Sequence, residues 1–239
     1  MPMAGLGSRF ANAGYNTPKP LIPVDGVPMF RKALTSVADI DAEKSFHFVI
    51  RQEHVAAQQL DRLIHEALPE ANITVLPTMT RGAAETALAA QDSLQVNAGL
   101  IVMDCDLWFR SAGYNRMVQD SLMDKNDISG GLLTFTSDNP RYSYAKFGTD
   151  GIVSETAEKR VISNHAITGA YYFARASDFI MAAQQLLTQQ LSEASPEYYL
   201  SLLYNVLIQQ GKKIQATTVD EFASFGTPEE LLALGESSE

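Results

Sequence analysis

The sequence predicts an α/β fold with a mixed, mainly parallel sheet and an antiparallel extension. In the first half of the chain, short apolar segments rich in β-branched residues alternate with stretches of helical periodicity. Between Ser129 and Phe173, strand-like segments instead follow one another with few helical residues between them. The composition is that of one globular domain, because 46% of the 239 residues are hydrophobic and 19% are charged.

The first half should supply the parallel part of the sheet. Each predicted strand is a short apolar run bounded by polar or turn residues, and these strands are residues 45–50, 73–76 and 99–103. The predicted helices around them are residues 27–40, 53–68 and 82–90. Ligands of such sheets bind near the carboxyl ends of the strands, which is where functional residues are expected.

The second half should supply the antiparallel extension and then more helices. Its predicted strands are residues 130–135, 144–147, 151–155 and 165–173. Two helices, from Ala176 to about Glu193 and from Glu197 to Gln210, precede a strand at residues 213–219. A last helix should begin at Thr227, because Thr227, Pro228 and Glu230 form the pattern of a capping box with proline in the first turn.

Charge and cysteine content exclude several classes of protein. The formal net charge is −10, whereas proteins that hold nucleic acid by general electrostatics present a basic face, so DNA and RNA are not expected partners. Cys105 is the only cysteine, which excludes an intrachain disulfide and fits a reducing compartment. No apolar run approaches the roughly 18 residues of a membrane span, and no signal peptide is recognisable. A cytoplasmic protein is expected, with its oligomeric state left open.

A glycine-containing turn at the start of the chain indicates a phosphate site. The segment Gly5–Arg9 reads GLGSR, and Lys19 follows between Pro18 and Pro20. Glycines allow a tight turn and a close approach of the backbone, while free N–H groups and nearby cations attract phosphate. The third glycine of a dinucleotide fingerprint and the Gly-Lys-Ser/Thr ending of a P-loop are both missing. Because only Met1–Met3 precede the turn, the strand leading into it is expected to be short, unless the chain begins later than its relatives.

The segment MDCD supplies carboxylates at the end of an apolar strand. If the strand continues, Asp104 and Asp106 point to one side and Cys105 points to the other. Two carboxylates beside a triphosphate suit Mg²⁺, which prefers oxygen ligands. Alternatively, the two aspartates simply cap the next loop.

These segments together resemble the sugar nucleotidyltransferases of the nucleoside-triphosphate transferase family, which includes cytidylyltransferase-like members. The resemblance runs from "GLGSRF" and "TPKPLIPVDGVPM" through "TRGAAETAL", "IVMDCDLWF" and "EKRVISNHAITGAYYF" to "FGTPEEL". It implies a Rossmann-like mixed sheet with helices on both faces, as a single domain over residues 1–239. It also implies a nucleotide-binding half at residues 1–128 and an acceptor-binding half at residues 129–239.

The implied reaction joins an NTP to a phosphorylated acceptor and releases pyrophosphate, with Mg²⁺ as cofactor. CTP, UTP or dTTP would be the nucleotide, and the acceptor a sugar phosphate or similar precursor of surface polysaccharide. The acceptor phosphate attacks the α-phosphorus in line with the leaving pyrophosphate, so catalysis is mostly positioning and charge neutralisation. No general base is needed, because the second pKa of a phosphate monoester is about 6.

The resemblance implies the roles of the nucleotide-site residues. Arg9 would hold the β- and γ-phosphates, and Lys19 would lie over the α-phosphate. Asp106 would bind the metal. The other implied nucleotide-binding residues are Ala4, Gly5, Leu6, Gly7, Ser8, Gly82 and Asp104, of which Gly82 belongs to the base-recognition loop. The alternative for Arg9 and Lys19 is a role as solvated surface charges.

The implied acceptor site comes from the second half of the chain. Lys159 would meet the acceptor phosphate beside Glu158, and Gly169 and Tyr171 would form the pocket wall. Glu197 would open a helix near the same pocket. As alternatives, Tyr171 is a core residue of its strand and Glu197 is an N-terminal helix charge.

Two side chains depart from the family pattern. Hexose-specific relatives carry glycine in the acceptor loop, where this chain has Ser143, so glucose 1-phosphate should be a poor acceptor. Another sugar phosphate, or a phosphorylated alcohol or amide, should be a better one. Thymidylyltransferases carry an aspartate as a second metal contact where this chain has Ser224, and Asp220 is the nearby candidate to replace it.

Two other functions remain open at this point. A metal-dependent glycosyltransferase of the related GT-A fold would also use an Asp-x-Asp segment, yet would not need the phosphate turn at Gly5–Lys19. A non-catalytic nucleotide-sensing domain is the other. Retention of Arg9, Lys19, Asp106 and Lys159 together argues against a sensor.

Overall fold

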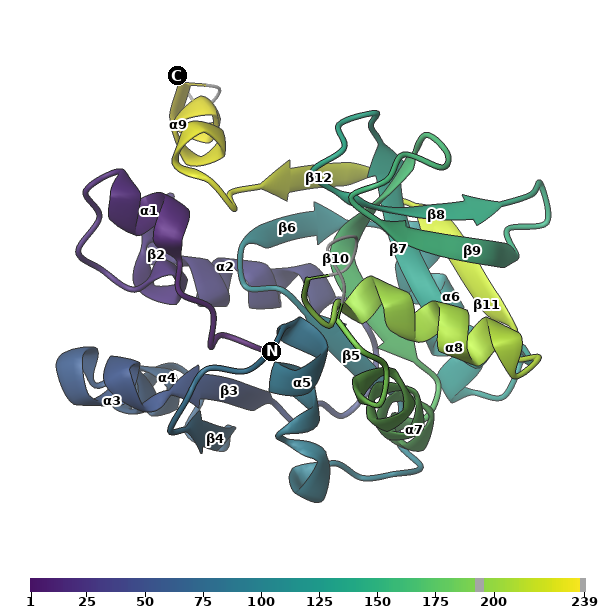
Figure 1. Cartoon of the computed structure of the whole chain (residues 1–239), viewed down its shortest axis with the longest axis horizontal. Coiled ribbons are helices and arrows are strands. Elements are labelled where there is room, and N and C mark those ends of the chain that lie inside the picture. Colours follow the sequence, from purple (N-terminus) through teal and green to yellow (C-terminus); the bar gives the residue numbers. More distant parts are fainter. Residues whose placement is uncertain (192–195, 237–239) are drawn as a thin grey trace. The chain divides into compact units, whose positions relative to one another are not determined.

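The computed structural model describes residues 1–191 and 196–236, and its α/β fold with a mixed sheet and flanking helices confirms the predicted class (Figure 1). The chain forms two compact units, each made of separate stretches of sequence. Unit 1 comprises Met1–Met79, Asp104–Arg110 and Asp220–Glu239, and unit 2 comprises Thr80–Met103 and Ser111–Val219. The division at residue 128 into halves for nucleotide and acceptor stays a prediction about binding.

In unit 1, β3 (His47–Arg51) and β4 (Asn72–Leu76) pair in parallel, as predicted. Pro2 forms a parallel bridge with Val49, and the backbone N–H of Met3 donates to the carbonyl of Val49 at 2.8 Å. The segment leading into the glycine turn is therefore a short extended stretch beside β3.

The predicted helices of unit 1 are each divided. Residues 53–68 form α3 (Gln52–Gln58) and α4 (Leu60–Ala67), because Gln59 between them adopts a left-handed φ of 52°. Residues 27–40 form β2 (Val27–Pro28), α2 (Met29–Leu34) and the 3₁₀ turn η2 (Thr35–Val37). The other short elements before β3 are α1 (Ser8–Asn12), η1 (Lys19–Leu21) and β1 (Pro23–Val24), which pairs with β2.

The end of the chain returns to unit 1. There β6 (Leu107–Arg110) and β12 (Glu221–Ser224) form an antiparallel ribbon that the sequence did not predict. The final helix α9 (Pro228–Glu236) follows. Its predicted capping box is confirmed, because the N–H of Thr227 donates to Glu230 Oε2 at 3.1 Å and the N–H of Glu230 donates to Thr227 Oγ1 at 3.3 Å.

Unit 2 contains a six-stranded mixed sheet in the order β11-β7-β10-β8-β9, with β5 also paired to β10. The strands are β5 (Leu100–Met103), β7 (Gly130–Thr136), β8 (Ser143–Phe147), β9 (Val153–Glu158), β10 (His165–Phe173) and β11 (Ile214–Thr218). Strands β7 to β10 pair antiparallel and form the predicted extension, whereas β11 pairs with β7 in parallel.

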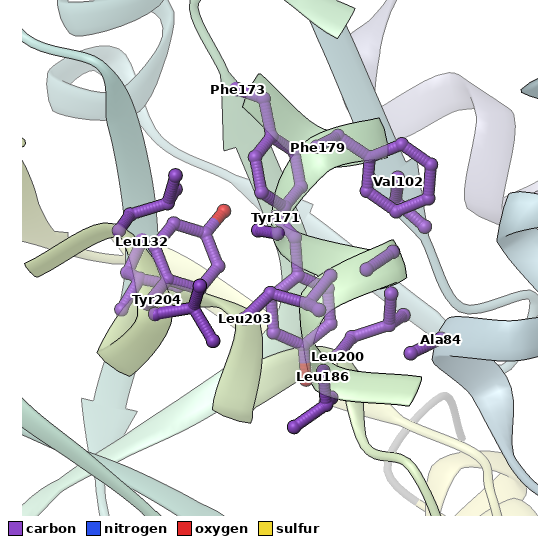
Figure 2. Packing of buried hydrophobic residues seen from close by; sticks show 14 of the residues in the cluster. Ala84, Val102, Leu132, Tyr171, Phe173, Phe179, Leu186, Leu200, Leu203 and Tyr204 are labelled. Atoms are coloured by element: carbon purple, nitrogen blue, oxygen red, sulfur yellow. The ribbon is translucent and has the colours of Figure 1, made fainter. Parts of the chain in front are cut away.

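Helices cover both faces of this sheet. They are α5 (Ala83–Leu88), α6 (Ala112–Leu122), α7 (Ala176–Leu187) and α8 (Leu203–Gln209), with the 3₁₀ turn η4 (Leu200–Leu202) before α8. Leu132 of β7 packs in the core with residues of α7 and α8 (Figure 2). Its neighbour Gly131 faces Met117 of α6, and since side chains alternate along a strand, α6 lies on the opposite face.

Two predicted helix boundaries in unit 2 differ from the structure. The helix predicted to reach about Glu193 ends at Leu187, and its last predicted residues lie outside the described residues. The helix predicted from Glu197 begins only at Leu200, as a 3₁₀ turn, so Glu197 is not a helical residue. Over the described ranges, the structure contains no helix with the length and apolarity that a membrane crossing requires.

Candidate active site

The glycine turn of unit 1 is built against Lys19. Gly7 adopts a left-handed φ of 62° as the N-cap residue of α1, and a Cβ added there would lie 3.2 Å from Cβ of Lys19. Glycine is thus required for the backbone conformation and for the close approach. Lys19 begins the 3₁₀ turn η1, between Pro18 and Pro20, so its backbone is restricted as well. Gly5, Leu6, Ser8 and Arg9 are exposed and Ala4 is buried.

Lys19 forms an ion pair with Asp106. Its Nζ donates to Oδ2 of Asp106, with 24% of the lysine side chain and 21% of the aspartate side chain exposed. Burial alone would lower the pKa of Lys19, but the charge of Asp106, its hydrogen bond and the charge of Asp104 together raise that pKa to about 12. The structure therefore brings Lys19, Asp104 and Asp106 together, with Lys19 protonated at neutral pH.

The MDCD segment leaves the strand before its carboxylates. β5 ends at Met103, so Asp104–Asp106 form a bend rather than a continued strand. Cys105 is nevertheless buried while the two aspartates are half-exposed, as the alternation predicted. Burial raises the pKa of the Cys105 thiol to about 12, which leaves it neutral and excludes a thiolate nucleophile at neutral pH.

The FGT segment after β12 packs directly on Asp106. The N–H of Phe225 donates to the carbonyl of Asp106 at 3.0 Å. A Cβ added to Gly226 would lie 2.6 Å from Oδ2 of Asp106 and 3.5 Å from Oε2 of Glu230. The absence of a side chain at Gly226 therefore leaves room for the Asp106 carboxylate.

Asp220 does not lie beside Asp106, which corrects the expectation that the two share a metal. The N–H of Asp220 donates to the carbonyl of Arg110, at the opposite end of the β6–β12 ribbon. Ser224 instead pairs with Leu107, the residue after Asp106. Positions 220 and 224 are four residues apart along nearly extended chain, a span of about 13 Å.

The carboxylates of this cluster suit a metal shared with substrate rather than a complete protein site. Within the described ranges, no group of three or more His, Cys, Asp or Glu side chains could hold a metal ion. Mg²⁺ commonly binds proteins through one or two carboxylates and takes its other ligands from water and substrate phosphates. Asp106, with Asp104 close by in the chain, fits that donor set.

A second cluster lies in unit 2, around Glu158 at the end of β9. Oε2 of Glu158 accepts hydrogen bonds from the hydroxyls of Ser143 and of Ser201, the latter at 2.9 Å. Ser143 pairs with Glu158 across β8 and β9, and Ser201 is fully buried in η4. Burial raises the pKa of Glu158, against the effect of the two hydroxyls and of Lys159. The predicted acceptor residues Ser143 and Glu158 are therefore in direct contact.

Lys159 follows Glu158 in a strained backbone conformation. Its φ is 51°, a left-handed value that a residue with a side chain adopts at a cost of roughly 1–2 kcal/mol. The Nζ of Lys159 donates to the hydroxyl of Tyr199 at 2.8 Å, and this hydrogen bond raises the pKa of the lysine. The charge of Glu197 acts on both Glu158 and Lys159, so it too belongs to this cluster.

The two remaining acceptor candidates lie in β10. Gly169 has a φ of 100° at an irregularity in the pairing of β10 with β7, a conformation that favours glycine. Tyr171 is only 6% exposed and stacks on Tyr204, with ring centroids 6.1 Å apart (Figure 2). Its placement supports the core alternative rather than a pocket wall.

The Thr80–Gly82 loop, expected to recognise the base, docks on the segment that carries Tyr198. The N–H of Tyr198 donates to the carbonyl of Arg81 at 2.9 Å, and the N–H of Ala84 donates to the carbonyl of Tyr198 at 2.9 Å. A Cβ on Gly82 would lie 2.6 Å from both the nitrogen and the oxygen of Tyr198. The Arg81 guanidinium, paired with Glu85, lies 5.0 Å from the Tyr198 ring centroid.

Comparison with known proteins identifies the family. The model of the nucleotidyl transferase family matches residues 3–217. The chain belongs to the nucleotidyl transferase family. The predicted family and class of enzyme, a nucleotidyltransferase, are thus confirmed.

Two solved structures resemble this nucleotidyltransferase over nearly its whole length. A nucleoside-diphosphate-sugar pyrophosphorylase from Vibrio cholerae RC9 has a TM-score of 0.82 and 28% identity, with 98% of this chain and 99% of that chain covered. A proposed glucose-1-phosphate thymidylyltransferase from Bacillus anthracis, in complex with sucrose, has a TM-score of 0.77 and 19% identity, with 99% and 93% covered. The second likeness shows the fold alone. No curated protein sequence matches this chain significantly.

Several contacts of this nucleotidyltransferase were missed by sequence analysis. Tyr199 contacts Lys159, which lies 40 residues earlier in the chain, and Ser201 contacts Glu158, which lies 43 residues earlier. No local sequence pattern predicts contacts over such distances along the chain. The available signal was their position just after Glu197, which the resemblance had already placed near the acceptor. Arg81 carries no sequence signal of its own beside Gly82, because its contact with Tyr198 joins residues that are far apart in the chain.

Proposed function

We propose that this nucleotidyltransferase joins CTP, UTP or dTTP to a small sugar phosphate or similar phosphorylated acceptor, with release of pyrophosphate and with Mg²⁺ as cofactor. The observation that carries the proposal is the half-buried pair of Lys19 and Asp106 packed under the Gly7 turn. The similarity to a nucleoside-diphosphate-sugar pyrophosphorylase supports a sugar phosphate as the acceptor class.

The triphosphate would be neutralised by the cations of unit 1. Arg9 is exposed and takes part in none of the ion pairs found among the described residues, so its guanidinium can bind the β- and γ-phosphates without losing a partner. The backbone of exposed Gly5 and of half-buried Gly7 can donate N–H groups to the same phosphates. Lys19 would neutralise the α-phosphate, where negative charge develops during attack.

Asp106 would hold the metal, with Asp104 two residues earlier in the chain. Bound Mg²⁺ supplies charge neutralisation at the phosphates and at the leaving pyrophosphate. In the resting protein Lys19 already neutralises Asp106, which keeps a half-buried carboxylate paired before substrate arrives.

The cluster of unit 2 would bind the acceptor. Lys159 is exposed and would contact its phosphate, while Glu158 would accept hydrogen bonds from its hydroxyl groups. Because the hydroxyls of Ser143 and Ser201 already bond to Oε2 of Glu158, they compete with acceptor hydroxyls for that oxygen. We therefore propose that glucose 1-phosphate is a poor acceptor, and that another precursor of surface polysaccharide is the substrate. The single, unpaired Cys105 supports a cytoplasmic location.

Pyrophosphate release tests the proposal directly. ATP, CTP, GTP, UTP and dTTP would each be offered with a panel of sugar phosphates and phosphorylated alcohols, with and without Mg²⁺. We expect pyrophosphate and an NDP-linked product with one pyrimidine nucleotide, only when metal is present. Sugar transfer from a nucleotide-sugar without pyrophosphate release would favour a glycosyltransferase, and NTP binding without any turnover would favour a sensor.

Arg9→Ala should lower turnover by about 10- to 100-fold, because one charge-assisted contact is worth roughly 1.5–3 kcal/mol. Pyrophosphate should compete with NTP in the parent enzyme, and its inhibition constant should rise in the variant. The measurement is initial rate against NTP and pyrophosphate concentration. An unchanged rate and an unchanged inhibition constant would show that Arg9 is a solvated surface charge without a role in phosphate binding.

Gly226→Ala should lower turnover by about 10-fold or more while the protein stays folded. The new methyl group would displace the Asp106 carboxylate, since it would lie 2.6 Å from Oδ2, and so disturb the contact with Lys19. Gly148→Ala is the control, because its Cβ would meet only the tip of Asp150 at 3.3 Å. Equal activities of the two variants, at equal melting temperatures, would contradict the prediction.

A further inference from the structure

We propose that the dipeptide Tyr198–Tyr199 couples the Thr80–Gly82 loop to Lys159, so that a nucleotide bound at the loop strengthens binding of the acceptor. This inference rests on the proposed function, in which the loop recognises the base and Lys159 binds the acceptor phosphate. Every contact that carries it lies within unit 2.

Tyr198 is fixed to the loop through its backbone and its ring. Its N–H and carbonyl make the two hydrogen bonds to Arg81 and Ala84, and the lack of a side chain at Gly82 permits that approach. The guanidinium of Arg81 lies over its ring. The hydroxyl of Tyr198 is anchored on the other side, donating to the carbonyl of Gln189 at 2.6 Å. A displacement of the loop therefore acts directly on the backbone of Tyr198.

Tyr199 fixes the tip of Lys159. The backbone of Lys159 is held by a hydrogen bond from its N–H to the carbonyl of Tyr142 at 3.1 Å. At the end of its long side chain, the Nζ donates a hydrogen bond to the hydroxyl of Tyr199 at 2.8 Å. The same Nζ lies 4.9 Å from the Tyr199 ring centroid. Tyr199 is thus a positioning residue for the acceptor lysine.

The two tyrosines are joined by one rigid peptide plane, so a change at Tyr198 is passed to Tyr199 over a single residue. Coupling between two binding sites is reciprocal, and an acceptor that fixes Lys159 should likewise strengthen nucleotide binding. The structure therefore provides a short connection between the two proposed sites, made of backbone hydrogen bonds on one side and a side-chain hydrogen bond on the other.

The test is the rate at which Lys159 reacts with a lysine-selective acylating reagent, followed by mass spectrometry of the full-length protein with and without each NTP and Mg²⁺. NTP should slow labelling of Lys159 in the parent. Tyr199→Phe should raise labelling without NTP by about 3- to 10-fold, the loss of one hydrogen bond, and should abolish the effect of NTP. Arg81→Ala should weaken the NTP effect, and Arg81→Lys should partly restore it.

Two controls separate coupling from other causes. Tyr144→Phe removes a hydroxyl that bonds to the carbonyl of Asn139 in the same unit, and should leave the NTP effect on Lys159 intact. Exposed Lys146 is an internal reference whose labelling should stay constant. The acceptor KM, measured with the best sugar phosphate of the pyrophosphate-release panel, should rise in Tyr199→Phe, while NTP binding measured without acceptor should be unchanged.

The outcomes distinguish this inference from the proposed function. If NTP slows Lys159 labelling equally in the parent, Tyr199→Phe and Arg81→Ala, the nucleotide merely shields the lysine and the coupling is wrong. If NTP binds and turns over but leaves Lys159 labelling unchanged in the parent, the coupling is wrong and the proposed function stands. If no NTP binds the parent at all, both are overturned.

Discussion

Asp106→Asn should lower turnover by at least about 100-fold while the protein remains folded, because the metal that we propose for this carboxylate would contribute several kcal/mol of charge stabilisation in the transition state. The amide keeps the size of the side chain and an oxygen acceptor for Lys19, so packing around Gly226 should survive. The rate should also lose its dependence on Mg²⁺ concentration in the range that activates the parent. Steady-state rates over a metal titration, with circular dichroism of both proteins, are the measurement.

Asp220→Asn is the matched control for this substitution. It makes the same chemical change in the same unit, but at the far end of the β6–β12 ribbon from Asp106. Turnover and metal dependence of Asp220→Asn should be close to those of the parent. Equal losses in the two variants would restore the shared metal that the sequence suggested, and near-normal turnover of Asp106→Asn would remove Asp106 from the metal site.

Local patterns in the sequence predicted those parts of the fold that local physics determines. The capping box at Thr227 formed as expected, since its donors and acceptors lie within three residues of each other. Apolar runs gave the strands of both parallel and antiparallel regions, because burial of alternating side chains selects them. Breaks within helices were harder to predict. At Gln59 one left-handed residue separates α3 from α4, although the apolar periodicity runs through both helices without a gap.

The Lys19–Asp106 pair and the cluster around Glu158 depend on contacts between segments that are distant in the sequence. These contacts were only partly predictable. The resemblance placed Lys19, Asp106 and Lys159 in motifs, yet it did not show that Lys19 and Asp106 are paired. The position of Asp220 was wrong because distance along the sequence was taken for distance in space, whereas an unpredicted ribbon extends the chain between Asp220 and Ser224. Tyr171 was ambiguous because a strand that enters a core shows the same alternation as one that lines a pocket.

The left-handed backbone of Lys159 supports the role that we propose for its side chain. A non-glycine residue with a φ of 51° persists when the surrounding structure holds it, and such residues are enriched at functional sites. An asparagine or glycine would adopt the same turn more easily. Lysine at this position therefore lowers the stability of the fold relative to glycine or asparagine, and an exposed turn residue without a role would not need to be a lysine.

Lys159→Ala should reduce kcat/KM for the acceptor by about 10- to 100-fold, the loss of one charged contact to its phosphate, while NTP binding without acceptor changes little. Lys159→Gly should show the same kinetic loss, since it also lacks the ammonium group.

The two variants should differ in stability, because glycine relieves the left-handed strain that alanine retains. We expect Lys159→Gly to melt about 2–4 °C higher than Lys159→Ala, which corresponds to about 1 kcal/mol. Acceptor and NTP titrations, with thermal unfolding of the three proteins, measure both effects. Equal losses of NTP and acceptor binding would place Lys159 outside the acceptor site, and equal melting temperatures would show that the turn is not strained by its side chain.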